Sequence, residues 1–363
     1  MGIPLLALCG KRSRKISCNP ENSGKVGVLC LGAIGDLLLA SGLLNGLAAL
    51  LPKARIEIIA SASNAASLAL LDNSFIKTAF PVSAAWRLLH YVRKNRYDLF
   101  IDTTQWARLG ALLARFSQAK TTIGFETRGQ HRGNGYDITV IHRSDVHEAE
   151  NFAALGRALF EDFIFSPKLT LPANFINPFA GCKVIAFHLW PARGLGRYLK
   201  AWPDEYWADL AKILLARGYR IILTGSREDV AETDNFINRF FSGEKNVVSV
   251  AGEYSLPDLA CILKNALALV SVNTGIMHLG ALLGTPTIGL HGATNPVRWG
   301  PLGSHTRSLL PTRGASAYLD LGFEYPDNAR PAMQWITVQD VLDSLDSLLA
   351  SGASFYNYGN PCT

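Results

Sequence analysis

Three short segments place glycine and a polar side chain directly after an apolar run, and the first of them carries a carboxylate. Gly32-x-x-Gly35-Asp36 follows the apolar run 26–31. Two glycines allow a sharp turn and the close approach of another molecule, and the helix that follows presents N–H groups that stabilise an anion. Asp36 is either a cap for these donors or a general base that accepts a proton from a hydroxyl. The spacing alone does not decide between the two.

The second segment is a basic loop between the predicted strand 183–189 and a helix that opens at Pro203. It carries Arg193, Arg197 and Lys200 together with two glycines. Cationic side chains and backbone amides are what surrounds a bound diphosphate in proteins. The alternative is a solvated basic loop without a ligand. The place of the loop at a strand end favours the binding role.

The third segment, Asn273-Thr274-Gly275-Ile-Met-His278, follows a buried strand and opens a helix. Thr274 and His278 are four residues apart, so they share one helix face. As a ligand site, the segment points its amides at whatever lies beyond the strand. As a structural element, Asn273 or Thr274 caps the helix and His278 is a core histidine. Ser226 and Glu228 follow the predicted strand 219–224. At that strand end a carboxylate can bind ribose hydroxyls.

These segments require a scaffold in which strands end at one edge. Apolar runs alternate with helical segments through both halves of the chain, which is typical of parallel βαβ units. The predicted strands are 26–31, 55–60, 97–104 and 121–125, then 183–189, 219–224, 247–250, 267–272 and 286–291. Prolines 167, 172 and 178 mark a boundary. We therefore expect an α/β chain of two doubly wound domains with a ligand cleft between them.

The predicted organisation has five parts. A tail covers 1–24, the first Rossmann-like domain 25–170, the second 171–335, a helix with one apolar face 336–350, and a second tail 351–363. The first tail holds a short apolar run and the cations Lys11, Arg12, Arg14 and Lys15. It is either a solvated or loosely docked tail or a weak contact with a membrane surface.

Composition limits the partners of this chain. The 363 residues include 35 Lys+Arg and 29 Asp+Glu, a net charge of +6. This excess is small for a nucleic-acid binder, and it suits phosphates or an anionic membrane equally well. The six cysteines lack metal-ligand spacing and indicate buried thiols in a reducing compartment, hence the cytoplasm. No apolar stretch of 18 residues predicts a membrane span.

Taken together and in this order, the segments resemble the heptosyltransferase family of GT-B glycosyltransferases, from about Val26 to Pro301. LGAIGDLLLAS is similar to the family's Gly-Asp motif, LKAWPDEYWADLA to its Lys-x-Trp-Pro segment, and NTGIMHLGALLGTPT to its Asp-Thr-Gly-x-x-His signature. The resemblance implies that Asp36 is the catalytic base. It also implies that Lys200, Thr274, Gly275 and His278 hold the donor diphosphate. Asn273 departs from the family's Asp, which weakens the assignment of ADP-heptose more than that of a nucleotide sugar.

The resemblance also implies an acceptor site in the first domain, and Gly35, in the turn after the first strand, is predicted to bind the acceptor there. The basic stretch 126–145 lies there, so Arg128, Arg132 and Arg143 are predicted to read phosphates of a glycan or glycolipid. The implied reaction is a single displacement with inversion, without metal or other cofactor, since no Asp-x-Asp motif occurs. The last helix is expected to cross back to the first domain. A nucleotide-sugar epimerase and a catalytically silent sugar-binding relative are the alternatives, whereas the missing G-x-G-x-x-G spacing disfavours a nicotinamide dehydrogenase.

Overall fold

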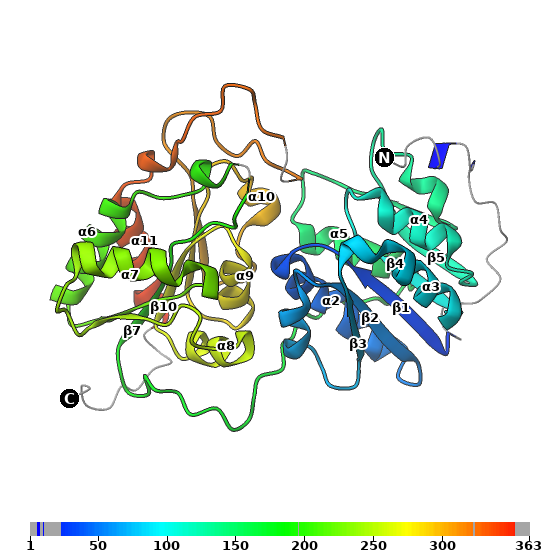
Figure 1. The fold of residues 1–363 in the computed structure, drawn as a ribbon, viewed down its shortest axis with the longest axis horizontal. Helices are drawn as coiled ribbons and strands as arrows, with labels where there is room; N and C mark the ends of the chain where they lie inside the picture. The colour runs from blue at the N-terminus through cyan, green and yellow to red at the C-terminus, as the bar shows by residue number, and fades with distance from the viewer. Residues whose placement is uncertain (1–5, 8–9, 11–22, 195, 322–323, 353–363) are drawn as a thin grey trace. The chain divides into compact units, whose positions relative to one another are not determined.

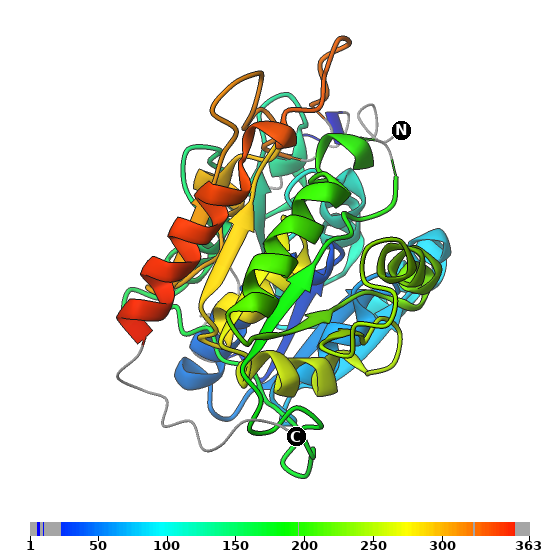
Figure 2. The same cartoon turned by 90° about the vertical axis from the view of Figure 1, so that its left-hand side faces the viewer.

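The structure is a computed structural model that describes residues 6–7, 10, 23–194, 196–321 and 324–352. It contains two compact units, Met1–Thr170 and Leu171–Thr363. Each unit holds a six-stranded sheet of parallel strands with helices packed against it (Figure 1). Figure 2 shows the helices of the second unit lying along its strands. The predicted α/β class with two doubly wound sheets is therefore confirmed.

In unit 1 the first strand lies in the middle of the sheet. The order is β3-β2-β1-β4-β5-β6. The strands are β1 (Lys25–Cys30), β2 (Arg55–Ser61), β3 (Ile76–Phe80), β4 (Leu99–Asp102), β5 (Thr121–Glu126) and β6 (Ile138–Ile141). The helices are α2 (Ile34–Leu50), α3 (Ala85–Asn95), α4 (Arg108–Phe116) and α5 (Glu148–Arg157), with short 3-10 turns η2 (Ala65–Leu70), η3 (Val82–Ala84) and η4 (Arg132–Gly135). Strands are added on one side of β1 up to β3 and on its other side from β4 to β6, so the direction of winding reverses between β1 and β4. Doubly wound sheets bind ligands at this point.

Unit 2 repeats this plan, with the order β12-β11-β10-β7-β8-β9. Its strands are β7 (Val184–His188), β8 (Arg220–Leu223), β9 (Val247–Ser249), β10 (Ala268–Val272), β11 (Thr287–Leu290) and β12 (Thr306–Leu309). Its helices are α6 (Asp204–Ala216), α7 (Val230–Phe240), α8 (Leu256–Lys264), α9 (Gly275–Leu282), α10 (Pro296–Trp299) and α11 (Val338–Gly352), with 3-10 turns η5 (Arg197–Leu199), η6 (Arg227–Asp229) and η7 (Met333–Trp335). Here winding reverses between β7 and β10.

Each unit has its own apolar core, which explains the continuous apolar runs in the sequence. In β1, Val26, Val28 and Leu29 are fully buried because helices cover both faces of the sheet. In unit 2, Phe187, Trp202 and Trp207 pack together, with ring centroids 5.1 and 4.9 Å apart. The two cores fix the strand ends that carry the candidate site.

The structure differs from the sequence-based expectation at several elements. Strands β3, β6 and β12 and helix α3 were not predicted; β6 lies inside the stretch 126–145, which was expected to be irregular. The predicted strand 286–291 is therefore not the last. The three strands were missed because they lie at sheet edges, where burial is incomplete and the apolar run is short.

Helix α11 packs on unit 2. Its residues Val341, Leu342, Leu345 and Leu348 belong to the core of that unit. A capping box precedes it, since the Asp340 carboxylate accepts from the Thr337 backbone N–H at 2.8 Å and the Thr337 hydroxyl accepts from the Asp340 backbone N–H at 3.1 Å. A crossing of the chain back to unit 1 stays a prediction. The two tails lie largely outside the described residues. Leu6 is an exception, because it is fully buried in the core of unit 1 rather than solvated.

The cysteines depart from the expectation of six thiols. Cys30 and Cys261 are buried and free, but Cys182 is disulfide-bonded. Burial raises the pKa of the Cys30 thiol to about 12, so this thiol is unreactive at neutral pH. Within the described part of the chain, no helix combines the length and apolarity needed to span a bilayer.

Candidate functional site

Asp36 lies in the first turn of α2, directly beyond the carboxyl end of β1. Its Oδ2 accepts a hydrogen bond from the Ala33 backbone N–H at 2.7 Å. The residue is only half-buried. A Cβ on Gly32 would come within 2.6 Å of Oδ2, so the glycine is needed for the carboxylate to fold back over the turn. Asp36 therefore caps its helix from the third helical position while part of the side chain stays at the surface.

The second oxygen of Asp36 is held from the neighbouring strand. Gln105, which follows β4, donates its side-chain amide to Oδ1 at 2.7 Å. The Gln105 backbone carbonyl in turn accepts from the Thr127 hydroxyl at 2.7 Å. Since β1 and β4 flank the point where winding reverses, these contacts place an oriented carboxylate where this fold binds ligands.

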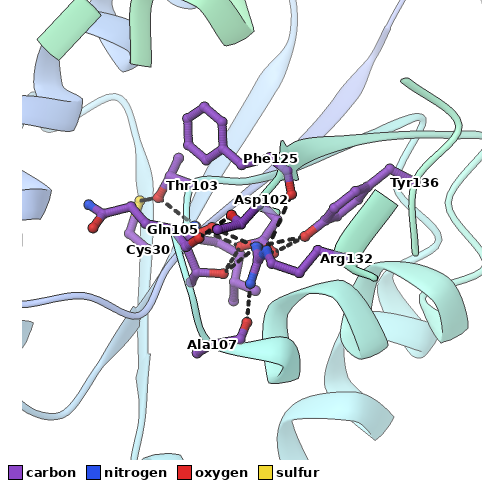
Figure 3. Close-up of polar contacts among 11 residues, drawn as sticks. Cys30, Asp102, Thr103, Gln105, Ala107, Phe125, Arg132 and Tyr136 are labelled. Carbon is purple, nitrogen blue, oxygen red and sulfur yellow. Dashed lines mark hydrogen bonds and ion pairs between the residues drawn. The ribbon is translucent and has the colours of Figure 1, made fainter. Parts of the chain in front are cut away.

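A buried ion pair supports the loop that carries Gln105 (Figure 3). The Arg132 guanidinium contacts the Asp102 carboxylate at 3.0 Å, and both side chains are fully buried. The Tyr136 hydroxyl donates to Asp102 at 2.5 Å. Arg132 also donates to the carbonyl oxygens of Phe125, Thr104 and Ala107. In Figure 3 both Arg132 and Tyr136 point toward Asp102, which lies at the end of β4.

The prediction that Arg132 reads an acceptor phosphate is wrong for this conformation. Every nitrogen of its guanidinium is used inside the unit, and none of the side chain is exposed. Arg132 is a positioning residue for the Thr104–Ala107 loop. Arg143 is exposed, but it forms an ion pair with Asp145 at 2.7 Å that raises its pKa. Arg128 is exposed and remains a candidate for acceptor binding.

In unit 2, two of the predicted donor-binding cations are already paired. Arg193 contacts Glu228 at 3.0 Å. Arg197 contacts Glu232 at 2.5 Å, and hydrogen bonding to that carboxylate raises the arginine's pKa. The two arginines therefore tie the loop after β7 to η6 and α7, and they do not present unpaired charge to a diphosphate. Glu228, which was predicted to bind ribose, is the carboxylate that pairs with Arg193.

Lys200 is different. Its side chain has no hydrogen bond or ion pair among the described residues, and it is half-buried, which lowers the pKa of its ammonium group. Thr274, the N-cap of α9, also has a buried hydroxyl without a hydrogen-bond partner among the described residues. Both follow the central strands β7 and β10 of unit 2. An unpaired cation and an unpaired hydroxyl at one sheet edge are suited to an anionic ligand.

The remaining predicted residues also lie just beyond strand ends, and their binding roles stay predictions. Ser226 caps η6, and its hydroxyl donates to Asp229 at 2.7 Å. Gly35 is buried in the first turn of α2, and His278 is buried in α9. Gly275 begins α9, where the N–H groups of the first turn point outward from the helix end.

The contacts of Asn273 give a reason why this chain has Asn where the family commonly has Asp. Its amide donates to the Trp299 carbonyl oxygen at 3.0 Å and contacts His291 Nδ1 at 3.2 Å. Burial lowers the pKa of His291 to about 3, so the ring is neutral and Nδ1 can accept. A carboxylate at 273 has no proton to donate to either acceptor. Here Asn273 holds the loop after β11 in place.

The described residues contain no group of three or more His, Cys, Asp and Glu side chains arranged to hold a metal ion. Sequence reasoning missed Asp102, Gln105 and Tyr136. The only signal was for Asp102 and Gln105, which lie at the carboxyl end of the predicted strand 97–104, at the same sheet edge as Asp36.

The sequence matches the profile of glycosyltransferase family 9 (heptosyltransferase) over residues 85–320, more than half of the chain. The chain belongs to this family. It is therefore a glycosyltransferase, as predicted. A lipopolysaccharide heptosyltransferase 3 of Escherichia coli is 23% identical over 358 residues, covering 88% of this chain and 98% of that protein.

Two solved structures have the same fold. The E. coli ADP-heptose lipopolysaccharide heptosyltransferase II superposes with a TM-score of 0.71 at 23% identity, covering 91% of this chain and 99% of that one. The E. coli heptosyltransferase WaaC with ADP superposes with a TM-score of 0.68 at 19% identity, covering 89% and 99%. These likenesses support the GT-B fold predicted from the sequence.

Proposed function

We propose that this enzyme transfers heptose from ADP-heptose to a lipopolysaccharide-type or other surface-glycan acceptor, with inversion and without a metal. The names of its relatives, which are lipopolysaccharide heptosyltransferases, support this substrate class. The proposal also includes work at the cytoplasmic face of the membrane, because such an acceptor is lipid-linked. The observation that carries the chemistry is the Asp36 carboxylate, held by Ala33 and Gln105 at the edge of the sheet in unit 1.

In the proposed step the acceptor hydroxyl attacks the anomeric carbon of the donor, and the bond from that carbon to the diphosphate breaks. Asp36 takes the hydroxyl proton as the new bond forms. The two donors that orient Asp36 keep it from rotating away, so little ordering is needed at the moment of attack.

Lys200 is proposed to stabilise the departing diphosphate, together with the Thr274 hydroxyl and the amides that begin α9. Its ammonium group lacks a partner in the described residues and is partly desolvated, so an arriving phosphate meets a cation that is not already neutralised. Arg193 and Arg197 contribute by holding the loop rather than by touching the diphosphate.

The main test replaces Asp36 with Asn, which keeps the size of the side chain and an oxygen that can cap Ala33. We expect transfer to fall on the order of 100-fold or more, with the affinity for ADP-heptose unchanged in titration calorimetry. The control is Asp340→Asn, because Asp340 accepts from the Thr337 backbone N–H at 2.8 Å in the same kind of capping box. Equal activity of Asp36→Asn and wild type would remove Asp36 from the role of base.

A second test addresses the donor site. Lys200→Gln should weaken donor binding on the order of tenfold or more, since it removes a charge-assisted hydrogen bond. Lys212→Gln is the control, because Lys212 is exposed on α6 and pairs with Asp209. A thermal-shift panel of ADP-, UDP- and GDP-sugars ranks base and sugar by mass action. Turnover of the donor without any acceptor would instead support an epimerase, and binding without transfer a silent relative.

A further inference from the structure

A second surface of unit 1 is apolar and lies on helices that the proposed chemistry does not use. A groove of about 940 Å³ lies between α3 and α4, which are in contact. Four leucines, Ala85, Trp86 and Phe116 contribute most of its lining. Trp86 is 81% exposed and Phe116 is 36% exposed. Large aromatic side chains exposed at one groove indicate that another molecule covers it.

The groove adjoins two smaller hollows that are basic. One, of about 480 Å³, is lined by His90, Arg93, Lys94, Arg96 and Gln118. The other, of about 420 Å³, includes Trp86, Arg87, His90 and Lys94. His90 lines all three spaces. We call the groove and the two hollows the α3–α4 surface.

The charge of the α3–α4 surface is one-sided. Arg87, Arg93, Lys94 and Arg96 are exposed, and none of them pairs with a carboxylate among the described residues. No acidic side chain of the described residues lines any of the three spaces. An apolar groove bordered by unpaired cations fits a partner that is apolar in one part and anionic in another.

Charge decides between the possible occupants. A second copy of the chain, docked through the same surface, would bring these cations together. The chain that follows Gly10 is also unsuitable, because it carries Lys11, Arg12, Arg14 and Lys15. A nucleic acid would pair with the cations but leave the apolar groove uncovered. An anionic bilayer supplies both parts, since tryptophan favours the membrane interface and arginine and lysine are attracted to acidic headgroups.

We propose that the α3–α4 surface docks on a bilayer that carries anionic phospholipids, with Trp86 and Phe116 at the level of the headgroups and the cations of α3 against their phosphates. The inference deepens the proposed work at a membrane and names the surface responsible. It is independent of the sugar and of Asp36.

The test is cosedimentation of the full chain with vesicles. Wild type should bind vesicles of phosphatidylcholine mixed with phosphatidylglycerol and not those of phosphatidylcholine alone, and added salt should weaken binding. Trp86→Ala should lose on the order of tenfold in affinity. The triple variant Arg87→Gln, Arg93→Gln, Lys94→Gln should lose on the order of 100-fold, about fivefold for each cation. Glutamine is a good helix former, so α3 keeps its structure.

Matched controls lie on unit 2. Trp335→Ala removes another exposed tryptophan. The double variant Lys212→Gln, Arg217→Gln removes one exposed cation of α6 and one directly after it. Both variants should bind like wild type. Transfer to a detergent-solubilised acceptor should be unchanged in the α3 variants, whereas Asp36→Asn should lose transfer and keep vesicle binding. The inference is overturned if the α3 variants bind like wild type, if neutral vesicles bind equally well, or if the variants abolish a dimer instead.

Discussion

Replacing Arg132 with Met tests whether this arginine is structural. The guanidinium is fully buried and paired with Asp102 at 3.0 Å, and it donates to three backbone carbonyl oxygens. Removing the guanidinium leaves the buried Asp102 carboxylate with fewer hydrogen-bond donors and no opposite charge. Breaking a buried pair from one side destabilises proteins by about 3–5 kcal/mol. For a unit of this size that corresponds to a fall in melting temperature of roughly 6–20 °C.

The assay is thermal and urea denaturation of Arg132→Met, with Arg128→Met as the control for an exposed arginine of the same segment. The control should change stability by no more than about 0.5 kcal/mol. Replacing the whole pair, as in Asp102→Leu with Arg132→Met, should recover part of the loss, because the buried charge disappears. The reasoning is refuted if Arg132→Met melts like wild type and raises only the KM for the acceptor, as a phosphate-binding arginine would.

Three further changes have defined outcomes. Gly32→Ala places a methyl group 2.6 Å from the Asp36 carboxylate and should lower kcat on the order of 100-fold with donor affinity kept. Normal turnover in a transfer assay would contradict this. Asn273→Asp removes donors to Trp299 and His291 and should destabilise unit 2 by about 1–3 kcal/mol in urea denaturation; unchanged stability would contradict the assigned contacts. Because burial lowers the pKa of His291 to about 3, the unfolded chain binds an extra proton below its ordinary pKa of 6.5. The free energy of unfolding should therefore fall by about 1.4 kcal/mol for each unit by which the pH is lowered from 6.5 to 3. His291→Gln should flatten that slope.

The sequence predicted the parts of the fold that are buried on both sides. The central strands β1, β7 and β10 are largely apolar runs, and each lies within one residue of its predicted bounds at either end. Edge strands such as β3 and β6 are short and half-exposed, so their periodicity does not rise above that of a loop.

The sequence was less informative about the site. It placed Asp36, Lys200 and Thr274 at strand ends, but it could not tell an arginine that faces solvent from one that is buried. Arg132 and Arg143 lie in the same basic stretch, and only the fold separates the fully buried one from the exposed one. Pairing between distant positions, such as Arg193 with Glu228, is set by how the loop after β7 packs against η6 and leaves no local pattern.

The central place of β1 and β7 also affects how the chain is made. Each is the first strand of its sheet to leave the ribosome, and the later strands add on both sides of it. Because parallel pairing waits for the crossover helix, each new half-sheet exposes apolar surface until its next strand arrives. A translation pause once α5, which ends at Arg157 and packs on α2, has left the ribosome would give unit 1 time to close before β7 emerges.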